Sequence, residues 1–160
     1  MWVVPLNEAP LAAHIVALDM REWDRKEIFA TRRDDDVADF AADVLECGPV
    51  FWAAGRYPNV PIAVFGCLEM WPGVWSMWFF ATDELPQIGK SVTRLIIKAI
   101  VPYLFQSGAH RLECRSMEGH VDAQRWLEVL GARREATLRA FGRGGEDFHV
   151  YVWDRPHVLQ

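Results

Sequence analysis

Three apolar segments joined by short turns constrain the fold of this chain more than any other feature. They are Val50–Ala54, Ile62–Trp71 and Val74–Ala81, and Gly55–Pro61 and Pro72-Gly73 separate them. Links of two to seven residues are too short to hold a crossover helix, so the three strands are expected to pair antiparallel. Because the segments are almost continuously apolar, we also expect helices on both faces of the sheet.

The residues before these strands predict a first strand and two helical regions. Val3–Leu6 has strand character, and residues 11–30 have helical composition, with Leu11, Ile15 and Leu18 as apolar positions. The apolar register is lost after Leu18, which predicts a bend or break near Asp19–Arg25. A second, cleaner helix is expected to end at Gly48-Pro49, with this buried stripe: Val37, Phe40, Ala41, Val44 and Leu45.

Three consecutive carboxylates, Asp34, Asp35 and Asp36, precede the second helix. Acidic side chains are favourable at the positive end of a helix dipole, so a solvated helix start explains them. A metal site would need further ligands at useful spacing, and the neighbouring sequence supplies none. The sequence therefore predicts no metal.

The C-terminal half predicts a helix, a strand, a second helix and a hairpin. The first helix runs from Ile88 or Gly89 to about Leu104 and is followed by the strand Arg111–Arg115, which should lie parallel to Val74–Ala81 because a helical crossover joins them. Its expected core positions are Val92, Leu95, Ile96, Ala99 and Tyr103. In the strand, Leu112 and Cys114 alternate with Arg111, Glu113 and Arg115, which predicts that the first two face the core.

The last third of the chain continues this alternation of strand and helix. Ala123, Trp126, Leu127 and Leu130 share one helical face, and Gly131 is typical of a helix C-terminus. Ala136–Phe141 and Phe148–Trp153 then predict a closing hairpin around Gly142–Gly145.

Length and composition indicate one domain spanning residues 1–160. An apolar content of 51% is sufficient for a single packed core. The three cysteines, Cys47, Cys67 and Cys114, are odd in number and lie in apolar runs, which favours buried thiols over disulfides or zinc ligands. The first residues lack a charged leader and a cleavage site, which argues against secretion. The apolar run of residues 57–82 is interrupted by proline and glycine, so no membrane span is predicted.

Charge is divided unevenly between the two halves of the chain, whose net charge is −5. Residues 1–84 hold 6 Lys and Arg against 14 Asp and Glu, whereas residues 85–160 hold 11 against 8. A basic half can bind phosphate groups of a nucleotide cofactor or of a nucleic acid. Extended nucleic-acid binding needs a basic stripe, and the sequence contains none, so a nucleic-acid partner is not expected.

The segment from His120 to Ala132 resembles the last strand and helix of the GNAT superfamily of N-acetyltransferases. The shared spacing is His120-x-x-Ala123-x-x-Trp126-Leu127-x-x-Leu130-Gly131-Ala132. The family mostly has Asn at the position of His120 and a Tyr, often credited as general acid, at that of Leu127. The order of expected elements also matches the family along nearly the whole chain. The resemblance therefore implies a GNAT-like α/β (α+β) fold, with a mixed, mostly antiparallel central sheet of six to seven strands flanked by helices.

In this family the pyrophosphate of acetyl-CoA binds at the start of the third helix, in a loop of pattern Gln/Arg-x-x-Gly-x-Gly/Ala, because backbone N–H groups and the helix dipole attract an anion there. The matching residues are Gln87-Ile88-Gly89-Lys90-Ser91-Val92, in which Lys90 and Val92 replace the two glycines. The resemblance implies that Gln87, Gly89, Lys90 and Ser91 contact the cofactor. Two alternatives remain. Lys90 adds a positive charge for the phosphate, or Lys90 and Val92 block the backbone cradle.

Two residues are candidates for acid–base catalysis. Glu69 is the one charge in an apolar strand pair, and burial would raise its pKa toward that of a useful base. Its alternative is a solvent-facing carboxylate at a strand end. His120 is a candidate proton carrier, and its alternative is a helix cap or a surface residue. Asp83 and Glu84 flank the cofactor loop and suit a helix entry.

Several segments also resemble a narrower family, the small GNAT-like proteins of tailed phages that are similar to internal virion protein A of podoviruses. They are residues 20–28, 48–50, 63–66, 78–85, 125–127 and 130–132. This resemblance implies a phage origin, a place in the cytoplasm of an infected bacterium or in the virion, and a virion or host protein as partner. Two functions follow as hypotheses. One is acetyl-CoA-dependent N-acyl transfer, and the other is a non-catalytic role in virion assembly.

Overall fold

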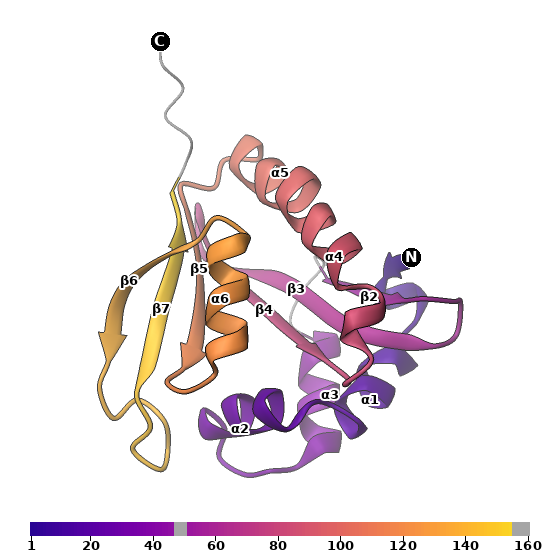
Figure 1. Ribbon diagram of the computed structural model, residues 1–160, viewed down its shortest axis with the longest axis horizontal. Coiled ribbons are helices and arrows are strands. Elements are labelled where there is room, and N and C mark those ends of the chain that lie inside the picture. The colour runs from indigo at the N-terminus through magenta and orange to yellow at the C-terminus, as the bar shows by residue number, and fades with distance from the viewer. Residues whose placement is uncertain (47–50, 155–160) are drawn as a thin grey trace. The chain divides into compact units, whose positions relative to one another are not determined.

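The computed structural model describes residues 1–46 and 51–154, and within them seven strands form one mixed sheet (Figure 1). The strand order is β1-β2-β3-β4-β5-β7-β6. β4 and β5 pair parallel, whereas β1 with β2, β2 with β3, β5 with β7 and β6 with β7 pair antiparallel. The strands are β1 Trp2–Pro5, β2 Phe51–Gly55, β3 Pro61–Trp71, β4 Val74–Ala81, β5 Arg111–Met117, β6 Arg133–Leu138 and β7 Phe148–Trp153. This confirms the expected fold class. Gly48-Pro49 and Cys47 lie outside the described residues.

The chain divides into two compact units. Unit 1 comprises Met1–Leu68 and Met77–Val92, and unit 2 comprises Glu69–Ser76 and the residues from Thr93 onward. The boundary crosses the β3–β4 hairpin and the helical segment after β4. The organisation of residues 1–160 as one domain stays a prediction.

Unit 1 contains helices α1 (Leu11–Leu18), α2 (Glu22–Ala30) and α3 (Val37–Glu46). The break between α1 and α2 falls at residues 19–21, as the loss of apolar register predicted. Asp36 caps α3, because its carboxylate accepts hydrogen bonds from the N–H groups of Ala38 and Asp39 at 2.8 and 3.0 Å. The acidic triplet therefore acts as a helix start.

The core of unit 1 lies between these helices and one face of β2, β3 and β4. α1 and α3 pack against each other, and Phe40 of α3 meets Phe80 of β4 edge to face, with ring centroids 5.0 Å apart. The three apolar positions of the first helical region, Leu11, Ile15 and Leu18, do not face the core. Their exposed fractions are 72%, 48% and 70%, while α1 buries Ala12, Ala13, Val16 and Ala17 instead. Small residues allow the close packing of α1, which leaves its larger apolar side chains outside.

The helical segment after β4 is not one regular helix. α4 (Gly89–Leu95) leads into a π-helical turn, Ile96–Ile100, and then into α5 (Val101–Gln106). Four of its buried residues, Val92, Ile96, Ile100 and Leu104, recur at every fourth position, and Phe105 is buried beside the last of them. A regular α-helix has about 3.6 residues per turn, so side chains four residues apart point in progressively different directions around the helix axis. The π turn contains more residues per turn, which brings the side chains back to the same face. The expected burial of Ala99 and Tyr103 is therefore wrong, and both are exposed.

Unit 2 is built on the pairing of β5, β7 and β6, with α6 (Val121–Val129) beside them (Figure 1). The indole N–H of Trp153 on β7 donates to the carbonyl of Leu130 at 2.9 Å, which ties the end of α6 to the sheet. Gly131 has φ +91°, as expected for a residue that ends a helix. β6 begins three residues earlier than predicted, and a register shift between Arg134 and Ala136 interrupts its pairing with β7.

Two details of β5 differ from the expected alternation. Cys114 is only half-buried, whereas Glu113 is 8% exposed. Glu113 forms ion pairs with Arg111 and Arg115 at 2.8 and 3.4 Å, and these neighbours cover its carboxylate. Of the other cysteines, Cys67 is buried, and burial raises the pKa of its thiol to about 12.

Helices long and apolar enough to cross a membrane are absent from residues 1–46 and 51–154.

Candidate functional site

The loop that the sequence predicts to bind the cofactor lies in unit 1, between β4 and α4. A 3₁₀ turn, Leu85–Gln87, contains Pro86, and α4 begins at Gly89. The carbonyl of Ile88 accepts hydrogen bonds from the N–H groups of Ser91 and Val92 at 2.9 and 3.0 Å, which starts the helix. Gln87, Lys90 and Ser91 are exposed, so their side chains are accessible from solvent.

Gly89 borders open space. A Cβ atom built on it would meet no atom within 4 Å apart from its chain neighbours and the backbone of its own helix. A phosphate group could therefore approach the backbone of this residue closely, which is the role that glycine plays in such loops.

Val92 does not obstruct the loop. Its side chain is fully buried, with 0% exposure, so it lies away from the solvent-facing side of the helix start. The alternative in which Lys90 and Val92 block the cradle is not supported at Val92, because that residue contributes to the core, and it stays a prediction at Lys90. Lys90 remains exposed and can supply a positive charge to an anion.

The end of β4 is held by a partly buried ion pair that sequence reasoning missed. Asp24 of α2 is 3% exposed, and Arg21 donates to its two oxygens from Nη2 and Nε at 2.7 and 3.0 Å. Oδ2 of Asp24 also accepts the N–H of Ala81 at 2.9 Å, and the N–H of Arg21 donates to the Ala81 carbonyl at 2.8 Å. The start of α2 therefore fastens the end of β4 next to the loop. The only local signal was an Arg-x-x-Asp sequence at a helix start.

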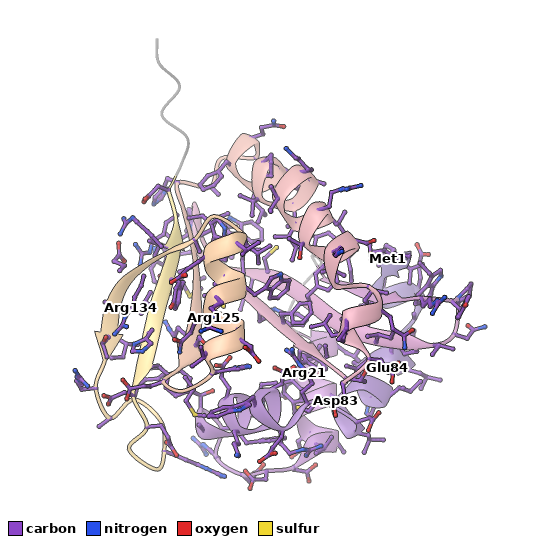
Figure 2. All side chains as sticks on the ribbon, in the orientation of Figure 1. Met1, Arg21, Asp83, Glu84, Arg125 and Arg134 are labelled. Atoms are coloured by element: carbon purple, nitrogen blue, oxygen red, sulfur yellow. The ribbon has the colours of Figure 1, made fainter. Side chains whose placement is uncertain are left out.

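The segment after Ala81 carries two exposed carboxylates. Asp83 and Glu84 follow Thr82, which forms an antiparallel bridge with Met20. Figure 2 shows the labelled side chains of Arg21, Asp83 and Glu84 around this end of β4. Glu84 occupies the cap position of the 3₁₀ turn, in agreement with a role in helix entry.

Glu69 does not have the burial on which its assignment as a base rested. It lies in unit 2 and is exposed, and its Oε1 accepts a hydrogen bond from the N–H of Gly73 at 2.9 Å. Gly73 has φ +82°, which suits the third position of a turn with Pro72 before it. Glu69 thus closes the β3–β4 turn, and its catalytic role stays a prediction that burial does not support.

His120 is buried, with 4% exposure, and occupies the N-cap position of α6. Its side chain does not form a capping hydrogen bond. The amide of Gln124 instead donates to the carbonyl of Met117 at 2.9 Å, across the turn that leads into α6. The alternative of a surface residue is wrong, and the proposed proton-carrying role stays a prediction.

Leu127 is buried, with 6% exposure, at the position where the resembling family has a Tyr. Its neighbour Trp126 donates from its indole N–H to Thr93 Oγ1 at 2.8 Å, which ties α6 to α4 within unit 2. At this position a buried leucine serves packing and cannot donate a proton.

His149 is a buried ionisable residue that the strand pattern did not single out. It lies on β7 opposite Ser116 and Thr137 and is 3% exposed. Its Nδ1 lies 3.2 Å from Thr137 Oγ1, and its Nε2 lies 3.9 Å from Glu118. Burial and the charge of Arg134 lower its pKa, although Glu118 and Asp147 oppose this change. His149 is therefore favoured in its neutral form.

We expect acid to destabilise the protein through His149. Because its pKa is lower in the folded protein than in the unfolded chain, the unfolded chain binds the proton more readily. The contribution of neutral His149 to stability should be complete above pH 6.5, the ordinary pKa of histidine. It should decrease as the pH falls below 6.5, and the decrease should end once the pH is below the lowered pKa of His149 in the folded protein. Urea unfolding of the parent and of His149→Gln between pH 8 and about 5 measures this. The variant should have a flatter profile than the parent.

The structure brings together some of the predicted residues. Gln87, Gly89, Lys90 and Ser91 lie in one loop of unit 1, whereas Glu69 and His120 belong to unit 2. Groups of three or more His, Cys, Asp or Glu side chains that could hold a metal are absent from residues 1–46 and 51–154.

Comparison with solved structures identifies the fold. Smu.2055 from Streptococcus mutans UA159 superposes with a TM-score of 0.71 at 15% identity, covering 96% of this chain and 99% of that one. The ribosomal-protein-S18-alanine N-acetyltransferase from Escherichia coli superposes with a TM-score of 0.65 at 14% identity, covering 99% and 98%. A Bacillus subtilis acetyltransferase in complex with CoA gives 0.57 at 19%, covering 73% and 83%.

The chain has the GNAT fold. No protein-family model matches the sequence, and the search of curated proteins gives no match either. The GNAT fold therefore rests on the structural similarity, which extends over nearly the whole chain at low sequence identity. Within this fold the loop at Gly89 occupies the segment between β4 and the next helix.

Proposed function

We propose that this protein transfers an acyl group from acetyl-CoA to an amine. The observation that carries the proposal is the open space beside Gly89 at the start of α4, with Val92 buried in the core. The proposal is supported by the shared fold of acetyltransferases, one of which was crystallised with CoA. Gln87, Lys90 and Ser91 are exposed around Gly89, as contacts to a pyrophosphate require.

The four loop residues have separate parts in the proposed binding. The backbone at Gly89 lets a phosphate approach, and the start of the helix provides a favourable dipole. Lys90 adds a positive charge, while Gln87 and Ser91 can donate hydrogen bonds from their side chains. When bound, acetyl-CoA supplies an activated acetyl group for attack by an amine.

The proposed reaction also needs a group that accepts a proton, because the acceptor amine must lose a proton from its ammonium form before it can attack the acetyl group. Glu69 and His120, both in unit 2, stay the candidates for this step. Since Leu127 replaces the family's Tyr, protonation of the leaving thiolate would have to come from solvent or from another residue.

Calorimetric titration with acetyl-CoA and CoA tests cofactor binding. We expect saturable binding at micromolar levels, on the order of −8 kcal/mol. Gly89→Ala adds a methyl group to open space, so it should leave thermal unfolding nearly unchanged but weaken binding about tenfold, because the methyl group keeps the phosphate away from the backbone. Lys90→Glu should weaken binding by a similar factor and more strongly at low salt, by reversing a charge beside the phosphate.

Lys98→Glu provides a matched control, since Lys98 is exposed further along the same helical segment. It should keep the parental affinity. Absence of heat up to millimolar acetyl-CoA, or equal affinities in the parent and in Gly89→Ala and Lys90→Glu, would remove this loop from consideration as a cofactor site.

A second candidate function is a non-catalytic one, in which the protein of a phage binds virion or host proteins. The buried Leu127 in place of a Tyr and the use of Glu69 in a hairpin turn favour this alternative. Its test is whether the protein is recovered with purified particles or with a defined host protein from infected cells. Recovery with neither, together with cofactor binding, would decide for the enzyme.

A further inference from the structure

The candidate cofactor loop is connected to β4 by a continuous series of hydrogen-bonded turns. The N–H of Leu85 donates to the carbonyl of Thr82 at 3.1 Å, and the N–H of Gln87 donates to the carbonyl of Glu84 at 3.0 Å. The N–H of Ile88 then donates to the carbonyl of Leu85 at 3.0 Å, directly before α4 begins. Because each turn starts within the one before it, a shift of Thr82 moves the start of α4 as well.

Thr82 is the first residue of this series and is buried, with 5% exposure. Its Oγ1 accepts a hydrogen bond from the N–H of Glu84 at 3.3 Å, in addition to the bond that its carbonyl accepts from Leu85. A threonine hydroxyl that accepts the N–H two residues later is typical of a tight turn. The N–H of Thr82 donates to the carbonyl of Ile62 on β3 at 2.9 Å. Thr82 therefore fixes the direction in which the chain leaves the sheet.

The start of α2 holds the preceding residue, Ala81, on the opposite edge of β4. The N–H of Ala81 donates to the carboxylate of Asp24 at 2.9 Å, and its carbonyl accepts the N–H of Arg21 at 2.8 Å. Thr82 bonds to β3 instead, because the backbone polar groups of successive residues in a strand point to opposite edges. The end of β4 is therefore held on both edges within unit 1, directly before the candidate loop.

The carboxylate of Asp24 is itself fixed in position and orientation. It is 3% exposed, and Arg21 donates to both of its oxygens at 2.7 and 3.0 Å. Bidentate pairing with a guanidinium sets the plane of a carboxylate as well as its location. Oδ2 is thereby aimed at the N–H of Ala81. A carboxamide at this position would keep one oxygen but lose the charge and the second acceptor.

We propose that Asp24 and Thr82 are positioning residues for cofactor binding, which hold the loop at Gly89 in the conformation that binds the pyrophosphate of acetyl-CoA. This inference rests on the function proposed above. Asp24 acts through the backbone of Ala81, and Thr82 acts through the turn that begins the loop. Neither side chain needs to touch the cofactor, because backbone N–H groups bind an anion well only when the preceding turns aim them correctly.

Calorimetric titration with acetyl-CoA, well below the unfolding temperature of every variant, tests the role of Thr82. Thr82→Val keeps the shape of the side chain but removes the acceptor of the Glu84 N–H, and it should weaken binding about fivefold. Thr82→Ser retains the hydroxyl and should bind acetyl-CoA like the parent, although it leaves a small cavity. A role limited to packing predicts the opposite order, because valine fills this buried position better than serine does.

Asp24→Asn tests the other positioning residue. It should weaken binding about tenfold, and it should accelerate amide hydrogen exchange at Gln87 and Ile88 more than at Phe40 in α3. Val44→Ala is the matched control, because Val44 is 5% exposed in α3 and its truncation destabilises the core of the same unit. It should accelerate exchange at Phe40 at least as much as in the loop, and it should keep the parental affinity.

Parental affinity in either Thr82→Val or Asp24→Asn would overturn this inference and leave the proposed function intact. The inference would be overturned as well if Thr82→Ser bound acetyl-CoA more weakly than Thr82→Val, or if Val44→Ala weakened binding as much as Asp24→Asn. A parent that does not bind acetyl-CoA would overturn the proposed function, and this inference with it. Titration of the parent first therefore distinguishes the two failures.

Discussion

Replacement of Asp24 by alanine is expected to lower the free energy of unfolding by about 3–5 kcal/mol. Asp24 is 3% exposed and accepts two hydrogen bonds from Arg21 and one from the N–H of Ala81. Its removal leaves a half-buried guanidinium and a strand N–H without their partner, and both groups are costly to leave unpaired. Urea unfolding monitored by tryptophan fluorescence measures the loss.

A double-mutant cycle shows whether the ion pair is the cause. Arg21→Ala should also destabilise, by leaving the Asp24 carboxylate without its cation, and Arg21→Ala/Asp24→Ala should be far less harmful than the sum of the two single changes. Glu22→Ala, at an exposed residue of the same helix, should leave stability nearly unchanged. Additive single effects would show that Arg21 and Asp24 stabilise the end of β4 independently.

Replacement of Gly55 by alanine is expected to cost about 2–3 kcal/mol through overpacking. Gly55 ends β2 and is buried, and a Cβ atom built there would lie 2.1 Å from the carbonyl oxygen of Val60. That oxygen belongs to the backbone of the β2–β3 turn, so the turn itself must shift to make room. Thermal unfolding should show a lower midpoint, and the register between Gly55 and Pro61 should be disturbed.

Gly89→Ala is the matched control for Gly55→Ala, because the added methyl group meets nothing within 4 Å there. It should leave the unfolding midpoint unchanged or raise it slightly, since alanine favours a helix more than glycine does. Equal effects at the two positions would mean that the close contact at Gly55 relaxes without cost. The same Gly89→Ala protein serves in the cofactor titration, so stability and binding are separated in one variant.

Local sequence alone was sufficient to predict which segments form strands, the β3–β4 turn and the break between α1 and α2, although β6 begins three residues earlier than expected. Pro72-Gly73 forces a tight turn, and Gly73 adopts the positive φ that glycine permits. The loss of apolar register after Leu18 marks the end of α1, and Asp36 caps α3 because a short carboxylate reaches the next N–H groups. These features depend on neighbouring residues, so a single sequence contains the necessary information.

The candidate loop was also identifiable from sequence, but its geometry was not. The position of Gln87, Gly89, Lys90 and Ser91 before a helix follows from the pattern of elements. Whether Val92 obstructs the loop depends on which way the helix turns its side chain. The core buries Val92, and the π turn after Leu95 keeps the later buried residues on the same face.

Tertiary structure alone decided the environments of the charged and apolar side chains. Asp24 is buried because α2 meets the end of β4, and His149 is buried because β7 lies between β5 and β6. Glu69 is exposed, and Leu11 is left outside because small residues bring α1 close to the core. The sequence by itself determined which segments form helices and strands, since those preferences are local. Burial, pKa and surface character arise from contacts between distant segments, and only the folded chain defines those contacts.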